Sequence, residues 1–183
     1  MGFAFDGDGD RLGLIDNKGN VIWADRQMIL YSRDILERNP GAKIVFDVKC
    51  SSLLPKDISE HGGEPIMSRT GHSFIKAKLK ETGAALGGEM SGHIFFKERW
   101  YGFDDALYTG ARLLEIISKT DQTCAEVFAD LPDSINTPEI NIHFDEQGDQ
   151  FKAMDKLATN VDFEGAEITT IDGVRVDYPN GWG

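Results

Sequence analysis

The chain has 183 residues, of which 31 are acidic and 19 are basic, so its formal net charge is −12. This acidity argues against a nucleic-acid backbone or an anionic membrane as the main partner, because both require clustered Lys and Arg. Hydrophobic residues make up 40% of the chain, which predicts a packed core, and no apolar run approaches the roughly 20 residues of a membrane helix. Cys50 and Cys124 form no CxxC pair and the N-terminus lacks the features of a signal peptide, so we expect a cytoplasmic globular protein.

The first 24 residues predict a small β-structure. Phe3–Phe5 is an apolar run that ends at a carboxylate-rich loop. Two further β-runs, Leu12–Ile15 and Val21–Trp23, flank the Asn- and Gly-rich segment 16–20. This pattern is typical of a hairpin.

Strands then alternate with helices as far as about residue 120. Apolar residues at helical spacing predict helices over 27–37, 53–61, 73–81 and 104–118, and short apolar runs predict strands over 44–46, 65–67, 84–86 and 94–96. Such alternation predicts a three-layer α/β/α domain with a mainly parallel sheet over residues 25–136.

The pattern changes near Leu131–Asp133. We expect a strand over Ile140–Phe144 and a helix over Gln150–Ala158. Two β-runs follow, at 167–171 and 174–178, and the Asp172-Gly173 pair between them predicts a hairpin. Residues 137–183 therefore predict an incomplete α+β domain. This segment holds 10 acidic residues but only three basic ones, so most cations for an anionic substrate lie before it.

Asp6-Gly7-Asp8-Gly9-Asp10-Arg11 places three carboxylates at alternating positions. Like charges about 4 Å apart repel by roughly 4 kcal/mol at an effective dielectric constant near 20, so the cluster favours a cation. All-oxygen ligands favour Mg²⁺ or Ca²⁺ over zinc. An EF-hand is excluded, because its glycine and glutamate positions hold Arg11 and Asn17. Asp6, Asp8 and Asp10 are candidate metal ligands, with a solvated acidic turn as the alternative.

The Gly-rich segment 87–93 lies between two predicted strands, where open α/β sheets bind ligands. Glu89 and Ser91 could hydrogen-bond vicinal hydroxyls, and His93 could exchange a proton near neutral pH. From the residues alone, an ordinary surface turn explains this segment equally well.

Two other segments also follow predicted strands. Thr70-Gly71-His72-Ser73 precedes a helix and could present His72 and backbone amides to an anion, although ordinary helix capping explains it too. Lys49 follows the strand 44–46, and its simplest interpretation is a surface lysine. Their shared placement after strands predicts that these side chains converge on one crevice.

Together these segments resemble the α-D-phosphohexomutase superfamily, and most closely its bacterial phosphomannomutase/phosphoglucomutase subgroup. The likeness extends over essentially the whole chain. The segments that carry it are 6–11 (metal loop), 47–50 and 70–73 (substrate-contacting turns), 88–93 (sugar-specificity loop), 96–100 and 172–179.

The resemblance implies a Mg²⁺-dependent enzyme that interconverts 1-phospho and 6-phospho hexoses, of mannose, glucose or both. It implies a phosphoserine and a hexose 1,6-bisphosphate intermediate, with Mg²⁺ held by Asp6, Asp8 and Asp10. The phosphohexose would be bound by Lys49, Gly71, His72, Glu89, Ser91 and His93. The catalytic residues would be Arg11, His72 and His93, with His93 the better general acid/base.

The chain departs from the family pattern in two places. It lacks the Ser-His-Asn nucleophile segment of the first domain and the Arg-x-Ser-Asn-Thr phosphate clamp of the fourth. Residues 134–138 resemble that clamp only loosely, because Ile135 is inserted and the arginine is missing. We therefore expect a fragment that needs missing domains 1 and 2, binds Mg²⁺ weakly or not at all, and is inactive alone. Its expected parts are the end of domain 2 (1–24), domain 3 (25–136) and the truncated start of domain 4 (137–183).

Two other functions remain open. One is a Mg²⁺ or sugar-phosphate binding module without catalysis. The other is a haloacid-dehalogenase-type phosphatase, because residues 3–10 offer an apolar strand followed by Asp-x-Asp. Asp10 argues against the phosphatase, since it stands where that family has Thr or Val.

Overall fold

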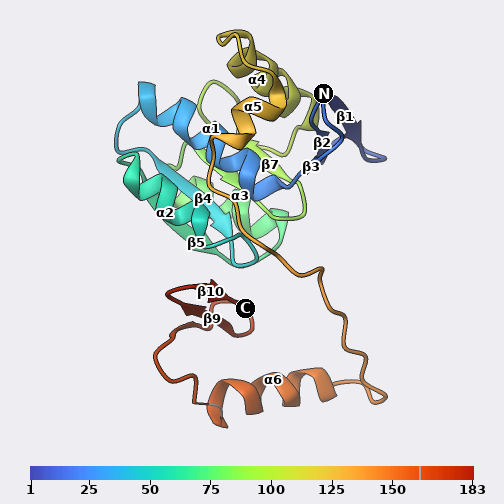
Figure 1. Cartoon of the computed structure of the whole chain (residues 1–183). Coiled ribbons are helices and arrows are strands. Elements are labelled where there is room, and N and C mark those ends of the chain that lie inside the picture. The colour runs from blue at the N-terminus through green and yellow to red at the C-terminus, as the bar shows by residue number, and fades with distance from the viewer. Residues whose placement is uncertain (161) are drawn as a thin grey trace. The chain divides into compact units, whose positions relative to one another are not determined.

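The computed structural model describes residues 1–160 and 162–183, and it comprises two compact units (Figure 1). Unit 1, Met1–Asp133, contains β1 (Gly2–Phe5), β2 (Leu12–Ile15), β3 (Val21–Ile22), α1 (Ala24–Arg38), β4 (Lys43–Asp47), α2 (Leu53–Glu60), β5 (Glu64–Ser68), α3 (His72–Thr82), β6 (Leu86–Gly88), β7 (Ile94–Phe96), α4 (Ala106–Ser118) and α5 (Cys124–Ala129). Unit 2, Ser134–Gly183, contains α6 (Asp149–Asn160), β8 (Glu167–Thr169), β9 (Arg175–Tyr178) and β10 (Gly181–Trp182). Within the described residues, no helix is both long enough and apolar enough to cross a membrane.

The predicted N-terminal hairpin is confirmed as part of an antiparallel sheet in the order β1-β2-β3. Its turn forms because the Asp16 carboxylate accepts hydrogen bonds from the backbone N–H groups of Lys18 and Asn20, at 2.8 and 2.9 Å. Along β2, Leu12 and Leu14 are buried. The sheet thereby packs one face on the core and carries residues 6–11 in the loop between β1 and β2.

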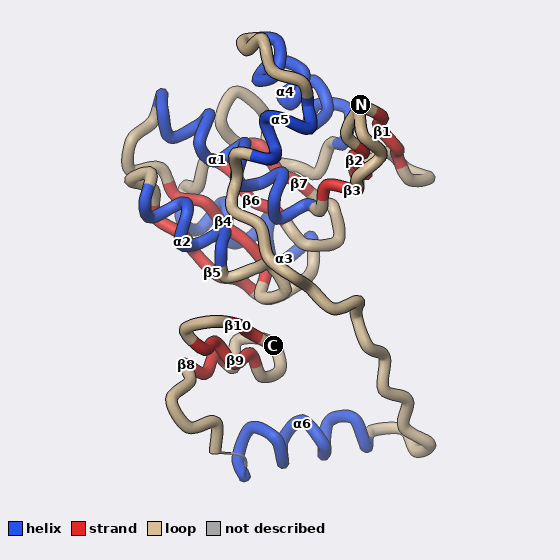
Figure 2. Tube along the Cα trace, viewed as in Figure 1, coloured by secondary structure: helices blue, strands red, loops and turns tan. Residues whose placement is uncertain are grey.

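The central sheet has the order β5-β4-β6-β7, with β4 parallel to β5 and β6 and with β7 antiparallel to β6. Side chains alternate across it. Ile44 and Phe46 join the core shared with α1, α2 and α4, whereas Val45 packs with Ile75 and Leu79 of α3. Helices therefore cover both faces of the sheet, and the predicted three-layer, mainly parallel architecture is confirmed (Figure 2).

The third predicted strand is displaced toward the glycines. It runs over Leu86–Gly88 rather than 84–86. A Cβ on Gly88 would collide with the Met28 sulfur of α1, and one on Gly87 would lie 2.8 Å from Ile75 Cγ2 of α3. Two glycines are needed here because helices approach closely from both faces, so the loop proper begins at Glu89.

The carboxyl ends of β4, β5 and β6 meet at one edge of the sheet, where Asp47 lies opposite Ser68 and Phe46 opposite Gly88. The segments that follow these strands carry Lys49, Gly71 and the loop Glu89–His93. The loop therefore lies at the predicted edge.

Two helix assignments differ from the sequence prediction. α4 begins at Ala106 rather than Asp104, because Asp105 is its N-cap and accepts a hydrogen bond from the Tyr108 N–H at 2.9 Å. Helix α5 was not predicted, although Thr123 and Glu126 form a capping box at its start.

Unit 2 contains the predicted helix, as α6, and the predicted hairpin around Asp172-Gly173, as antiparallel β8 and β9. β10 was not predicted, and it pairs with β9. The predicted strand over Ile140–Phe144 is wrong: these residues form no helix or strand. The reason is that no described strand pairs with them, and Ile140 and Ile142 are each 75% exposed.

Candidate functional site

The loop between β1 and β2 gathers the three predicted metal ligands. Asp6, Asp8 and Asp10 each offer a carboxylate oxygen, and these oxygens all lie within 4.8 Å of one another. The Asp6 carboxylate accepts hydrogen bonds from the backbone N–H groups of Asp10 and Arg11, both at 3.2 Å. Gly9 at φ +74° permits this tight turn.

The electrostatics of the loop suit a hard divalent cation. The Arg11 guanidinium, whose Nε lies 2.5 Å from Asp6 Oδ2, lowers the pKa of Asp6 below its ordinary range. Burial raises the pKa of Asp10, and the neighbouring Asp6 and Asp8 carboxylates raise it further. Asp10 Oδ1 is buried without a hydrogen-bond partner among the described residues. A cation would satisfy that oxygen and offset the repulsion, so the donor set fits Mg²⁺ or Ca²⁺.

Backbone contacts attach the metal loop to the two segments around it. Gly9 C=O accepts a hydrogen bond from the Ala106 N–H at the start of α4, at 3.1 Å. On the other side, Arg11 and His93 form an antiparallel bridge, and the Leu12 N–H donates to Gly92 C=O at 3.5 Å. The metal loop and the loop 89–93 therefore form one connected structure.

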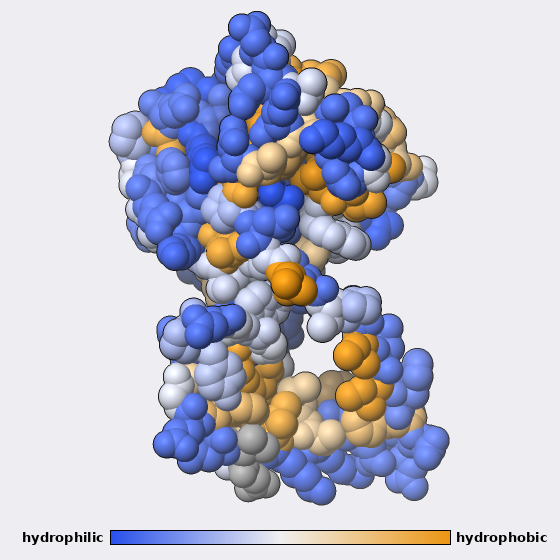
Figure 3. Space-filling model, in the orientation of Figure 1, coloured by the Kyte–Doolittle hydropathy of each residue, from blue (hydrophilic) through white to orange (hydrophobic). Residues whose placement is uncertain are grey.

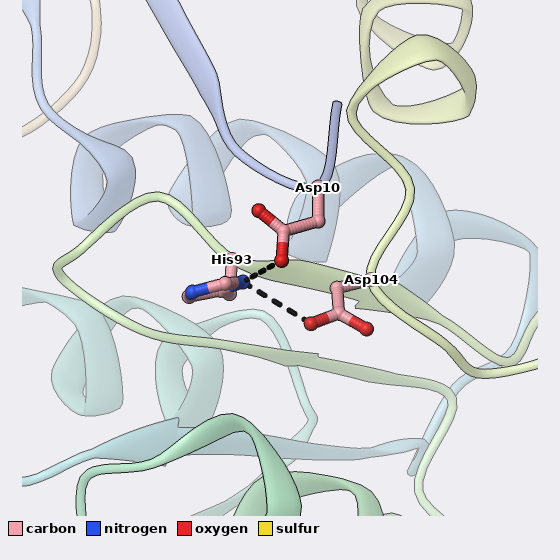
Figure 4. A group of neighbouring side chains, drawn as sticks. All are labelled: Asp10, His93 and Asp104. Atoms are coloured by element: carbon pink, nitrogen blue, oxygen red, sulfur yellow. Dashed lines mark ion pairs between the residues drawn. The ribbon is translucent and has the colours of Figure 1, made fainter. Parts of the chain in front are cut away.

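His93 lies between two carboxylates (Figure 4). Its Nδ1 is 3.1 Å from Asp104 Oδ2 and 3.6 Å from Asp10 Oδ2. The His72 ring stacks on the His93 ring, with centroids 5.7 Å apart. Burial alone would raise the pKa of Asp104, but the hydrogen bond from Lys76 Nζ at 3.1 Å and the surrounding charges lower it. Asp104 is therefore an anion facing both histidines.

Glu89 links the loop after β6 to the turn after β5. It is 2% exposed, and its Oε1 accepts a short hydrogen bond from the Gly71 N–H. Its Oε2 accepts from Ser91 Oγ at 3.2 Å. Because an ionised carboxylate can accept about four hydrogen bonds, these two contacts leave the Glu89 carboxylate able to accept further ones.

An open hollow of about 360 Å³ adjoins these groups. Asp6 and Arg11 of the metal loop line it together with residues 90–92. The remainder of its wall comes from β1, β2, β3 and the start of α1.

The structure brings most of the predicted site residues into two adjoining groups. One contains Asp6, Asp8, Asp10, Arg11, His72 and His93, and the other contains Gly71, Glu89 and Ser91. Lys49 lies exposed in the turn after β4. Their roles in substrate binding and catalysis stay predictions.

Two carboxylates at this edge, the buried one of Asp47 and the partly buried one of Asp104, were not predicted as site residues. Asp104 was assigned to a helix, and the available signal was the Asp104-Asp105 pair, of which only one can be the N-cap. Asp47 ends β4 within the segment 47–50, and its carboxylate could not be placed from the sequence because its partners lie after other strands.

Residues 23–135 match the family described as phosphoglucomutase/phosphomannomutase, alpha/beta/alpha domain III. The whole chain is 56% identical over 183 residues to a phosphomannomutase/phosphoglucomutase of Pseudomonas putida. It is 59% identical over 184 residues to a phosphoglucomutase of Neisseria meningitidis. It spans 39% and 40% of these relatives, about two fifths of their length. A solved phosphoglucomutase/phosphomannomutase family protein from Burkholderia thailandensis aligns with 99% of this chain and 38% of its own, at TM-score 0.92 and 54% identity.

Proposed function

This chain belongs to the phosphoglucomutase/phosphomannomutase family, and we propose that it supplies the metal loop and the sugar-binding loops of a phosphohexomutase. The enzyme would interconvert 1-phospho and 6-phospho hexoses of mannose, glucose or both. The observation that carries this proposal is the backbone bridge between Arg11 and His93, because it fixes the cation-binding carboxylates beside a histidine.

Asp6, Asp8 and Asp10 would hold Mg²⁺. Bound there, Mg²⁺ would offset the negative charge of a phosphoryl group during transfer. Arg11, which lies beside Asp6, would orient a phosphate.

His93 would exchange a proton with a sugar hydroxyl. Its Nδ1 faces Asp10 and Asp104, so a proton on Nδ1 is stabilised there and Nε2 is left to accept one. His72 stacks on the same ring and would contact the substrate from the start of α3. A helix N-terminus favours an anion such as a phosphate.

Sugar recognition would fall to the loops after β4, β5 and β6. Glu89 and Ser91 would bind adjacent hydroxyls, while Lys49 and Gly71 would contact the phosphohexose from the neighbouring turns. The nucleophile would be a phosphoserine from outside these 183 residues, and the intermediate a hexose 1,6-bisphosphate. We therefore expect the chain to be inactive alone and to need the parent chain's domains 1 and 2.

The cellular location is a proposal of the same kind. Cys50 and Cys124 are both buried, and neither is part of a disulfide bond. Cysteines that stay reduced are typical of a reducing compartment, which supports assignment to the cytoplasm.

The test uses a complete enzyme in which these 183 residues replace the matching segment of the Pseudomonas putida relative. With Mg²⁺ and glucose 1,6-bisphosphate, this chimera should convert glucose 1-phosphate and mannose 1-phosphate to their 6-phosphates. Asp10→Asn should lower kcat by about 100-fold or more, since a charge-stabilising group is lost. Glu37→Gln, at an exposed position of α1, is the matched control and should leave kcat unchanged.

Other outcomes point to the alternatives. Release of inorganic phosphate without isomer would indicate a phosphatase, and substrate binding without turnover would indicate a binding module. Turnover by the 183 residues alone would mean that another residue replaces the missing nucleophile.

A further inference from the structure

Asp47, the last residue of β4, is fully buried and contacts three different segments. Its Oδ1 accepts hydrogen bonds from the Met90 N–H at 3.2 Å and from Cys50 Sγ at 3.0 Å. Its Oδ2 accepts one from Thr70 Oγ1 at 3.1 Å. One carboxylate therefore joins the turn after β4, the turn after β5 and the loop after β6.

Burying the Asp47 carboxylate at the end of this strand lowers the free energy of unfolding, compared with an apolar side chain at the same position. A carboxylate loses its hydration on burial, and each of these three donors is uncharged. The residues before it, Val45 and Phe46, are buried in the two apolar cores. An apolar side chain would suit the sheet itself, so the carboxylate serves the loops rather than the strand.

Each of the three contacts lies next to a predicted substrate group. Cys50 follows Lys49, Thr70 precedes Gly71, and Met90 separates Glu89 from Ser91. Glu89 then adds a second link, because it accepts from the Gly71 N–H. The loops after β5 and β6 are thus tied to each other and to the end of β4.

We infer that Asp47 is a positioning residue that fixes the three substrate loops in one mutual geometry. This inference rests on the proposed function for its catalytic consequence. Asp47 would not contact the sugar; it would act through Lys49, the Gly71 amide and Glu89. A displacement of about 1 Å in a substrate-binding group can lower the rate about 100-fold. Loss of the Asp47 carboxylate should therefore lower kcat strongly.

The experiment compares two buried carboxylates in the chimeric enzyme. Asp57 is 1% exposed and pairs with Arg33 between α2 and α1, away from the predicted substrate loops, so Asp57→Ala is the matched control. Asp47→Ala should lower kcat/KM for glucose 1-phosphate by about 100-fold, mostly in kcat. Asp57→Ala should lower thermal stability but leave kcat/KM within about twofold at a temperature where it is folded.

Conservative variants keep the test decisive if Asp47→Ala fails to fold. Asp47→Asn retains an acceptor for Met90 and Cys50, and its amide can donate to the Thr70 hydroxyl, so it should recover kcat/KM to within about tenfold. Thr70→Val removes one of the three contacts and should cost about three- to tenfold. A folded Asp47→Ala enzyme with unchanged kcat/KM, an Asp47→Asn enzyme no more active than Asp47→Ala, or a Thr70→Val variant that loses stability but keeps its full kcat/KM, would overturn the inference.

A second measurement separates this inference from the proposed function. Amide hydrogen exchange at Gly71 and Met90 is measured in the 183-residue chain, with no substrate and no turnover. Asp47→Ala should accelerate exchange at both amides, whereas Asp57→Ala should not. Faster exchange with an inactive chimera would refute the proposed function but support the loop geometry; unchanged exchange would refute the positioning role.

Discussion

Units 1 and 2 contain similar kinds of secondary structure but differ in what those elements bury. Nearly every helix and strand of unit 1 contributes to one of two apolar cores, one on each face of the central sheet. In unit 2, Val176, at 8% exposure, is the only apolar side chain among the described residues that is buried. Helix α6 exposes Phe151, Met154 and Leu157, and apolar surface is visible on this unit (Figure 3).

The difference shows that local sequence signals are sufficient for elements but not for a core. The amphipathic spacing in α6 and the Asp172-Gly173 turn produce a helix and a hairpin without much burial. Elements that lack tertiary packing are marginally stable in water. The candidate site lies wholly in unit 1, where its loops are attached to a packed sheet, as preorganised binding requires.

The largest expected effect comes from separating the units. A chain of residues 1–133 should unfold cooperatively with nearly the Tm of the 183-residue chain, because the apolar cores lie within it. Residues 134–183 alone should show no cooperative transition. Circular dichroism melts of the three chains measure this.

A large loss of Tm in 1–133 would contradict the comparison, because it would mean that unit 2 contributes to the stability of unit 1. Limited proteolysis is an independent check. Cleavage of the whole chain should begin within residues 134–148, which are without helix or strand, and should leave unit 1 intact.

The same contrast applies to single phenylalanines. Phe96 is 1% exposed, and its ring packs edge-on against Tyr31 and Tyr108 with Arg112 above it. Phe96→Ala should lower the free energy of unfolding of unit 1 by about 3–5 kcal/mol. Phe151→Ala, at a 69% exposed position of α6, should change the main unfolding transition by less than about 0.5 kcal/mol. Urea unfolding followed by circular dichroism measures both, and equal effects would show that α6 is packed in solution.

A smaller effect depends on pH. Burial alone would raise the pKa of Asp34, but hydrogen bonds from Arg38 and Arg112 lower it to about 2 in the folded state, below the unfolded value of 3.8. The lower folded pKa stabilises the protein fully above about pH 4, and that stability is lost as the pH falls toward 2. The pH-dependent part is about 2 kcal/mol, and about half of it should be gone at pH 3.

Urea titrations of the wild type and Asp34→Asn at pH 7, 5 and 3 test this sign. The difference in unfolding free energy between them should be constant from pH 7 to 5 and should narrow at pH 3. Asp155→Asn, on an exposed position of α6, is the control and should show no such narrowing. A constant difference down to pH 3 would mean that the Asp34 pKa is not lowered by its arginine partners.

Much of unit 1 could be predicted because its elements are encoded locally. The helices over 27–37 and 53–61 and the strands at 44–46 and 65–67 were each placed to within a few residues, since apolar periodicity and Pro or Gly stops agree there. Gly87 and Gly88 were wrongly assigned to a loop, because the packing that requires glycine there involves residues distant in sequence. Gly87 and Gly88 lie inside β6, where only contact with α1 and α3 demands glycine.

The sequence could predict which residues are candidates for the site, but not which side chains they contact in the folded protein. Alternating aspartates predicted a loop of neighbouring carboxylates, and the structure brings those carboxylates together, whereas their role as metal ligands stays a prediction. The position after a strand singled out Glu89 and His93 as candidates, and His93 lies beside the carboxylates of Asp10 and Asp104. The sequence did not predict Asp47 and Asp104 as site residues. Their carboxylates contact Met90 and His93, which are distant in sequence and meet them only in the folded protein. The predicted strand over 140–144 is wrong for the opposite reason: the alternating pattern exists, but none of the described strands pairs with it.

The smallest expected effect concerns metal binding by unit 1 alone. Asp6 is already paired with Arg11, and Mg²⁺ usually retains several waters and a substrate phosphate when only one or two carboxylates bind it. We therefore expect a dissociation constant in the millimolar range. At 5 mM Mg²⁺ the stabilisation should be about 1 kcal/mol or less, which corresponds to about 3 °C in Tm.

Measuring the Mg²⁺-induced change in Tm for residues 1–133 and for the 183-residue chain shows which unit binds the ion. If Mg²⁺ binds at Asp6, Asp8 and Asp10, residues 1–133 should show the whole shift, and Asp8→Asn should abolish it at constant ionic strength. If instead the shift needs residues 134–183, diffuse binding to the 10 acidic residues after position 136 is the cause. A micromolar dissociation constant by calorimetry would contradict the prediction, because it would show that three aspartates beside a paired arginine hold the ion without a phosphate ligand.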